Sequence, residues 1–440
     1  MDARDSRRRS TLKAWLHVER RLTRRRSERV WHWRGLTLEL FLQFGYGMME
    51  HCRFLIGQWD GGVVVLSPRD LSAGQLQRLA DQVHGLNGTV LLDPQIYRPT
   101  FSHGRLIKHT FWPTTGFAFG GAELSRCLTE LITLNEQLNT GSIVLPGLYA
   151  ERIDDDWLQN QLLILEEAQR QDVAPEMMFH TVAISSDALR NDVQVEVLLD
   201  AIRGWDVDGI YLVCQHPNSD YYVSDPGWLA NCLDLIAGIR LDHKSCVVGY
   251  ANHQMLIASA AGASAICSGT WMNVRSFGVE KFDTNNDEEV KQRATWYYAP
   301  HLLAEFKVQY LDLAKKVGEL ATLKSSPALL SPYADELFSA PQPTLAAFTE
   351  QQAFRHYLQS LRAQAQAAVQ DTFDATVDSQ LQQLDTARNE LLRLRRLGIV
   401  GQQRDMSDAI DASRGALESL RVTRGAVLRR MWRNVAFDVV

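Results

Sequence analysis

The sequence lacks long apolar runs, although apolar residues make up 45% of its 440 positions. Its longest apolar stretches have the length of a β-strand, whereas a transmembrane helix needs about 20 mostly apolar residues. The basic N-terminus is not followed by the apolar core and small-residue cleavage site of a secretory signal peptide. We therefore expect no membrane association and a cytoplasmic protein.

Cysteine is scarce and shows no motif spacing. The six cysteines form no Cys-x-x-Cys pair, and no His-x-His or Glu-x-x-His pair accompanies them. This pattern excludes a disulfide framework and predicts free thiols in a reducing compartment. It also predicts no tightly bound structural zinc, and we expect no other metal or cofactor.

The net charge of −6 conceals a strong segregation of charge along the chain. Residues 1–34 hold 12 Lys or Arg against 4 Asp or Glu, and residues 388–433 hold 11 Arg against 5 acids. The rest of the chain is acidic, with 23 basic and 43 acidic residues. Basic ends on an acidic body favour docking of a polyanion or an acidic partner. Solvated helix faces are the alternative interpretation.

Eight short apolar runs alternate with helical patterns, and this alternation predicts a (β/α)8 TIM barrel. A doubly wound open sheet is the runner-up, but no glycine-rich phosphate fingerprint follows the first run. The predicted strands are Leu38–Phe44, Gly62–Leu66, Thr89–Leu92, Ser142–Leu145, Met178–Ile184, Gly209–Cys214, Cys246–Gly249 and Ala263–Cys267.

The predicted barrel spans residues 37–324. A basic amphipathic helix precedes it within residues 1–36, and a proline-punctuated linker, 325–343, follows it. Residues 344–440 are predicted to be helical and to offer a surface for a protein partner. Clustered arginines in the N-terminal helix are expected to contact nucleic-acid phosphates. These arginines are Arg7, Arg8, Arg9, Arg24, Arg25 and Arg26.

Barrel sites lie at the carboxyl ends of the strands, and that rule selects the candidate residues. Asp93 is the strongest, because a carboxylate at the end of a buried strand can act as a base or a nucleophile. A loop-capping aspartate before Pro94 is the alternative. Cys267 is a second candidate for catalysis, although an inert buried thiol is the more common role. Predicted substrate-binding residues are Gln95, Tyr97, Gln215, His216, Asn252, His253 and Trp271. Residues 98–120, rich in aromatics and glycine, are predicted to form a lid.

Two segments resemble the tRNA-guanine transglycosylase superfamily. One is ISSDALRNDVQVEVLLDAIRGWDVDGIYLVCQHPNSD, and the other is GYANHQMLIASAAGASAICSGTWMNVRSF. LLDPQIY falls where that family has an Asp-Ser-Gly-Gly-Phe-Gln stretch, so the resemblance implies that Asp93 contacts or protonates a base. The resemblance as a whole covers roughly residues 38–370. The family includes enzymes that act on tRNA and a branch that inserts deazaguanine bases into DNA.

The sequence departs from the family at its catalytic centre. Cys267 stands near the position of the nucleophilic aspartate, Ser185-Ser186 replaces a double glycine, and the zinc cysteines have no counterpart. Two hypotheses follow. The chain is a transglycosylase-like enzyme acting on a nucleobase in tRNA or DNA, or it is a non-catalytic nucleic-acid-binding or scaffold subunit of a larger complex. A barrel enzyme acting on an unrelated metabolite is a third reading. The sequence leaves homo-oligomerisation open.

Overall fold

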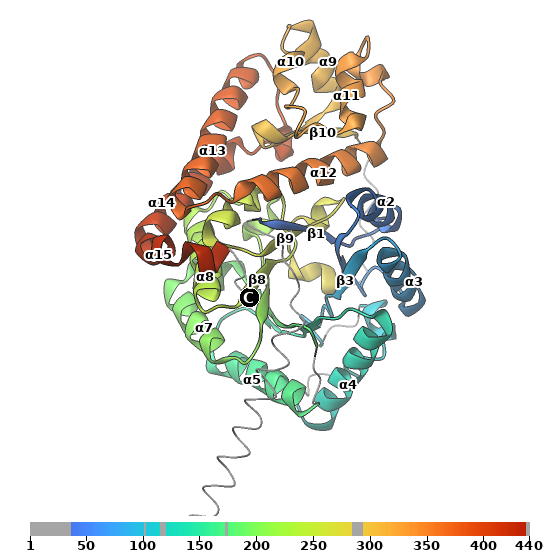
Figure 1. Cartoon of the computed structure of the whole chain (residues 1–440), viewed down its shortest axis with the longest axis vertical. Helices are drawn as coiled ribbons and strands as arrows, with labels where there is room; N and C mark the ends of the chain where they lie inside the picture. The colour runs from blue at the N-terminus through green and yellow to red at the C-terminus, as the bar shows by residue number, and fades with distance from the viewer. Residues whose placement is uncertain (1–36, 101–102, 115–119, 172–174, 284–293, 437–440) are drawn as a thin grey trace, which may run out of the picture.

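A computed structural model of the chain describes residues 37–100, 103–114, 120–171, 175–283 and 294–436. The predicted N-terminal helix and its six arginines lie outside these residues. In the described part, parallel strands curl into an α/β barrel-like fold with helices around the outside (Figure 1). The order of the strands is β3-β2-β1-β9-β8-β7-β6-β4, with β5 paired to β6.

The strands agree with the eight predicted apolar runs to within about two residues at each end. Valine, isoleucine and leucine dominate them, as expected for parallel strands that are buried on both faces. The strands are β1 Glu39–Gln43, β2 Gly62–Leu66, β3 Gly88–Leu92, β4 Ile143–Leu145, β5 Tyr149–Ala150, β6 Met178–Ile184, β7 Gly209–Cys214, β8 Ser245–Val248 and β9 Ala265–Ser268.

The first and last of these strands lie side by side. β1 pairs with β9 in a parallel register in which Glu39 lies opposite Ala265 and Leu42 opposite Ser268. Among the described residues, no hydrogen-bonded ladder joins β3 to β4, so the sheet has a seam between these two strands. The carboxyl ends of the strands face one way, and their loops meet at that end.

Helices with recognisable start signals follow most of the strands. Ser72 caps α3 in a capping box with Gln75, as its position predicts, and Asp154 caps α5. These helices are α2 Met49–Trp59, α3 Ala73–His84, α4 Gly121–Leu138, α5 Asp155–Arg170, α6 Ser186–Arg190, α7 Asp192–Gly204 and α8 Pro226–Leu241. Between β8 and β9 the chain forms a 3-10 helix, η3 His253–Ala261.

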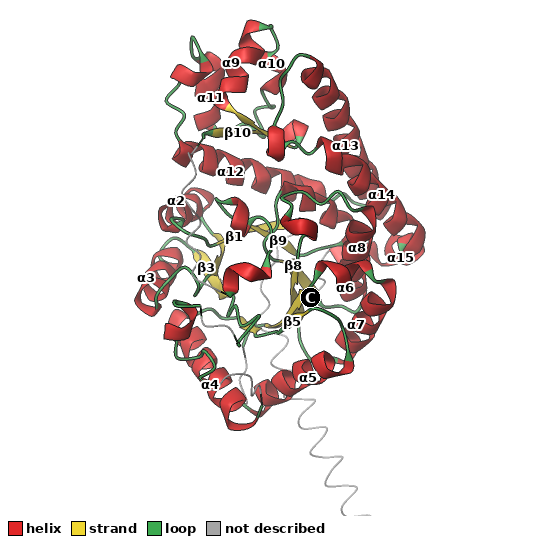
Figure 2. Cartoon of the chain, turned by 180° about the vertical axis from the view of Figure 1, so that it is seen from behind, coloured by secondary structure: helices red, strands yellow, loops and turns green. Residues whose placement is uncertain are grey.

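The chain after β9 begins with elements that are not among the predicted strands and helices. An antiparallel hairpin, β10 Trp296–Ala299 and β11 Ala304–Lys307, comes first. The predicted linker contains a helix, α11 Pro332–Ser339. Figure 2 shows these elements packed above the barrel-like body, with the long α12 between the two. The remaining helices are α9 Val308–Lys316, α10 Leu320–Leu323, α12 Glu350–Ala368, α13 Phe373–Arg396, α14 Ser407–Thr423 and α15 Gly425–Ala436.

Candidate functional site

Asp93 lies directly after β3 and is fully buried at the carboxyl end of the sheet. The hydroxyls of Tyr97 and Tyr250 donate to its Oδ2 atom at 2.8 and 2.9 Å, and the backbone N–H of Gln95 donates to Oδ1 at 3.0 Å. The Tyr211 hydroxyl lies 3.4 Å from Oδ2 and donates to Gln43 at 2.9 Å. Tyrosine side chains from the loops after β3 and β8 and from within β7 therefore converge on one carboxyl group.

A chain of hydrogen bonds links this carboxyl group to a second one. The Gln95 Nε2 amide donates to the hydroxyls of Tyr250 and Ser67, both at 2.9 Å, and Ser67 donates to Asp70 at 2.7 Å. Gln95 and Tyr250 have φ angles of 57° and 54°, which non-glycine residues rarely adopt. Backbone strain of this kind costs on the order of 1–3 kcal/mol per residue and tends to cluster at functional sites.

Burial changes the acidity of Asp93. It raises the pKa of this carboxyl group from 3.8 to about 6, against the opposing hydrogen bonds from Tyr97, Tyr250 and Gln95 and the charge of Lys281. The hydroxyls that donate to it stay protonated, because burial raises the pKa of Tyr97 and Tyr250 well above the usual value. A carboxyl group of this acidity exchanges protons near neutral pH, as a general acid or base must.

The raised pKa of Asp93 predicts a pH-dependent stability that Asp93→Asn should remove. The folded state holds the proton more tightly than the unfolded chain, so Asp93 favours folding fully below about pH 4. That contribution is lost as the pH rises from about 4 to about 6 and amounts to about 3 kcal/mol. Urea unfolding should show that the stability of Asp93→Asn rises by about 3 kcal/mol relative to the unmodified protein between pH 4 and 7.

Parallel pH profiles for the two proteins would contradict this assignment. Tyr97→Phe provides a companion variant, because it removes a hydrogen bond that favours the ionised carboxylate. Its loss of stability should therefore extend to a higher pH than in the unmodified protein.

A segment after β9, residues 269–283, covers this centre, and we refer to it as the roof. Phe277 and Phe282 pack edge-on against the Tyr97 ring, with centroids 5.2 and 4.8 Å away. The Lys281 ammonium lies 3.9 Å from the centroid of the Tyr250 ring and donates to the Asn273 carbonyl at 2.6 Å. The roof thus excludes water from Asp93 and places a positive charge beside it.

Cys267 lies in β9 and is fully buried on the same side of the sheet as Asp93. Burial, followed by the charge of Asp93, raises the pKa of the Cys267 thiol well above its usual value. A nucleophilic cysteine needs its thiolate, so this environment argues against the predicted catalytic role.

The other predicted site residues lie elsewhere. Gln215 accepts a hydrogen bond from Tyr149 and donates to Glu280 of the roof at 3.2 Å. Burial lowers the pKa of His216 and of His253 to about 4, so both imidazoles are neutral at pH 7. Asn252 caps η3, and Trp271 packs on Phe354 of α12 and donates to the Tyr46 carbonyl at 3.0 Å. Only Gln95 and Tyr97 of the predicted binding residues touch Asp93.

The sequence analysis missed Tyr211 and Gln43 as members of this centre. Tyr211 shares one face of β7 with Gly209 and Val213, because every second residue of a strand points the same way. A tyrosine hydroxyl within a buried apolar strand requires a polar partner, and that requirement was the available signal.

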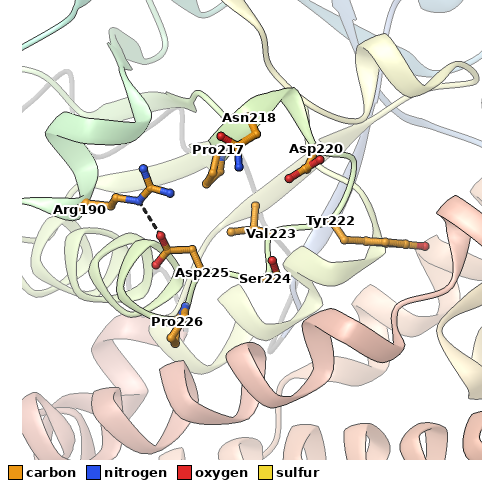
Figure 3. Close-up of a pocket in the computed structure, with 9 residues that line it drawn as sticks. All are labelled: Arg190, Pro217, Asn218, Asp220, Tyr222, Val223, Ser224, Asp225 and Pro226. Carbon is orange, nitrogen blue, oxygen red and sulfur yellow. Dashed lines mark hydrogen bonds and ion pairs between the residues drawn. The ribbon is translucent and has the colours of Figure 1, made fainter.

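A separate hollow of about 370 Å³ lies beside the loop after β7 (Figure 3). The Arg190–Asp225 ion pair, at 2.5 Å, crosses one side of it. The volume suits a small molecule. The lining residues are Arg190, Pro217, Asn218, Asp220, Tyr222, Val223, Ser224, Asp225 and Pro226. None of these belongs to the Asp93 centre.

Arginines of the C-terminal helices mostly pair with carboxylates of the same chain. These partners come from distant segments, such as Asp234 of α8 and Glu319 before α10. The internal pairing leaves less positive charge for phosphates at this end of the chain. The pairs are Arg388–Asp411, Arg393–Glu319, Arg395–Asp405, Arg404–Glu305, Arg414–Asp385, Arg421–Asp378, Arg424–Asp234 and Arg429–Asp374.

Within the described residues, no group of three or more His, Cys, Asp or Glu side chains is arranged to hold a metal ion. No helix in the same part of the chain combines the length and the apolar character needed to cross a membrane. All six cysteines are free and buried.

Comparison with known proteins gives a likeness of fold only. No protein-family model matches the sequence, and no curated protein matches it. Among solved structures, the chain is similar to a deoxyribose phosphate aldolase from Aeropyrum pernix. The sequence identity is 13%, the match covers 56% of this chain and 89% of that chain, and the TM-score is 0.32. A likeness at this level carries no information about activity.

Proposed function

We propose that this chain is a divergent transglycosylase-like protein that acts on a nucleobase in tRNA or DNA, with Asp93 as the carboxyl group that contacts the base. The observation that carries the proposal is the buried Asp93 with a pKa near 6, held by three donors at the end of β3. The resemblance of LLDPQIY to the family's aspartate stretch points to the same residue.

The proposed fold is a (β/α)8 barrel whose eight main strands enclose the core, with no hydrogen-bonded ladder between β3 and β4 in the described part of the chain. The cyclic order of the eight main strands supports this reading, since they follow one another around the sheet in chain order. The proposed site then lies at the carboxyl ends of the strands. That is where barrel enzymes bind their substrates.

The proposed chemistry is reversible proton transfer between Asp93 and a flat heterocycle. Asp93 would take a proton from a ring N–H and return it, which suits a carboxyl group that titrates near neutral pH. The Gln95 amide orients Tyr250, and Tyr250 in turn orients the carboxylate. The rings of Tyr97, Phe277 and Phe282 provide apolar surfaces on which a base can stack once the roof moves.

A second candidate function is a non-catalytic nucleic-acid-binding or scaffold subunit of a larger complex. The buried Cys267 thiol favours it, because base exchange through a covalent intermediate needs a nucleophile. The complete burial of Asp93 beneath the roof also favours the non-catalytic subunit, because a buried carboxyl group does not meet a substrate.

Base exchange distinguishes the two functions. The purified protein is supplied with labelled guanine or a labelled deazaguanine, and with tRNA and duplex DNA in separate reactions. The first proposal expects incorporation into one polymer, lost in Asp93→Asn and retained in Asp234→Asn, a carboxyl-to-amide control in α8. No incorporation together with salt-sensitive binding favours the subunit, and deleting residues 1–34 should then weaken the salt dependence. If the protein shows no incorporation and binds neither polymer, both proposed functions are refuted.

A further inference from the structure

Arg275 stands in the middle of the roof with only 1% of its surface exposed. Its Nε atom donates to the Gly269 carbonyl at 2.7 Å, closing the roof on itself. Its Nη1 atom donates to Glu305 at 3.1 Å, and its guanidinium carbon lies 3.4 Å from the centroid of the Tyr357 ring. Glu305 and Tyr357 belong to β11 and α12, so the C-terminal region holds the roof from outside the barrel.

Glu305 is the centre of a buried group of three charges. It is 3% exposed, and its second oxygen accepts from Arg404 at 2.8 Å. Arg404 lies between α13 and α14, and its guanidinium covers the Trp296 ring of β10 at 4.4 Å. Burial raises the pKa of Glu305, but the charges of Arg404 and Arg275 outweigh it and hold the pKa at about 2. The carboxylate is therefore charged at any physiological pH.

A buried guanidinium is tolerated only where a carboxylate neutralises it, because an unpaired charge in the interior costs several kcal/mol. Arg275 also contacts the Tyr221 hydroxyl at 3.4 Å, but among these partners Glu305 supplies the negative charge that balances it. The same roof reaches Asp93 two residues later, since Phe277 packs on both Tyr97 and Tyr250. The Phe277 carbonyl also accepts from the His216 backbone N–H at 3.2 Å, which ties this part of the roof to the loop after β7.

We infer that Glu305 is a positioning residue that fixes the roof over Asp93 through Arg275, so that the C-terminal region sets access to the site. The inference rests on the proposed function for its biological meaning, because it concerns the regulation of the same site. Its physical content is independent of any reaction. Weakening the Glu305–Arg275 pair should open the barrel mouth while the remainder of the barrel stays closed.

Alkylation of Cys267 measures this opening. The thiol is fully buried, and the charge of Asp93 acts on it, so Cys267 lies near the centre that the roof covers. Under this inference a reagent such as iodoacetamide reaches it more readily once the roof moves. Cys52 in α2 is equally buried and serves as an internal control for general loosening. Rates at the two thiols are measured by mass spectrometry of their peptides in the full-length protein.

Glu305→Gln is expected to raise the alkylation rate of Cys267 at least tenfold more than that of Cys52, because the loss of global stability acts on both thiols and the opened roof acts on Cys267. The control variant is Asp234→Asn, which breaks the Arg424–Asp234 tie between α14 and α8 without touching the roof. It should leave both rates unchanged. An unchanged rate at Cys267 in Glu305→Gln, or an equal rise at Cys52, would overturn the inference.

Arg404→Gln is the second variant if Glu305→Gln does not fold. It keeps the Glu305–Arg275 pair and removes only the outer charge, which is 12% exposed. It should give a smaller rise at Cys267 and none at Cys52. A purely structural role would leave the titration of Asp93 unchanged, whereas an opened roof hydrates the carboxyl group and shifts its pH window downwards.

The alkylation experiment involves no nucleic acid and no base. A failed base-exchange assay would therefore refute the proposed reaction and leave the positioning role standing. An unchanged Cys267 rate would refute the positioning role and leave the reaction open to its own test.

Discussion

Glu305→Gln should lower the free energy of unfolding at pH 7 by about 3–5 kcal/mol, because it leaves Arg275 and Arg404 buried without a counter-charge. Glutamine keeps the shape of the side chain, so the loss reports the missing charge. Urea unfolding measures the effect. The control Asp234→Asn removes a partly exposed ion pair and should cost at most about 1 kcal/mol.

Lowering the pH should reduce the difference in the free energy of unfolding between Glu305→Gln and the unmodified protein. The pKa of Glu305 in the folded state, about 2, lies below its ordinary value of 4.5. Its contribution to stability is therefore complete above about pH 4.5 and is lost as the pH falls towards 2. A gap that stays constant down to pH 2 would show that the charge of Glu305 does not support the fold.

Gly147→Ala should cost about 3 kcal/mol or more, because the chain after β4 runs against the backbone of β6. A Cβ atom at this position would lie 1.9 Å from the Thr181 carbonyl oxygen, and a backbone atom cannot rotate away. The segment would have to move off β6, breaking the short β5 pairing at Tyr149 and Ala150. Overpacking of this kind typically costs 1–3 kcal/mol, and contact with backbone puts this case at the upper end.

Gly204→Ala is the matched control for this prediction. Gly204 ends α7, and a Cβ atom there would meet nothing within 4 Å. Alanine favours helix more than glycine does, so this variant should be neutral or slightly more stable. Urea unfolding of both variants under one set of conditions compares them. Similar destabilisation by the two substitutions would contradict the argument from the close approach.

The strands were predictable because buried parallel strands are short apolar runs bounded by polar and glycine residues. Gly62–Leu66, Met178–Ile184 and Gly209–Cys214 have the predicted bounds. The capping of α3 by Ser72 was predictable for a local reason, since a serine before a helix satisfies a free backbone N–H.

Structure that depends on distant partners was not predictable in the same way. β10 and β11 form a hairpin because Trp296–Ala299 pairs with Ala304–Lys307, and no local pattern marks that pairing. The helical segment after β6 breaks at Asn191, which caps α7. Arg424 separates α14 from α15.

About half of the residues of the candidate centre could be predicted from their positions after a strand, and the other half could not. Asp93, Gln95 and Tyr97 come in one short stretch after a predicted strand, so the barrel rule selected them together. Tyr211 and the roof meet Asp93 only through folding, and no local pattern marks that contact. The lid was predicted within 98–120, whereas the segment that covers Asp93 in the described structure is 269–283.

The pairing of β1 with β9 has a consequence for synthesis of the chain. Residues 39–43 leave the ribosome long before residues 265–268, so one side of β1 has no partner strand while more than 200 residues are added. Translation at about 5–20 residues per second makes that interval on the order of ten seconds or longer. During this time an apolar strand edge is open to pairing with other chains, so the incomplete chain is prone to aggregation until β9 is made.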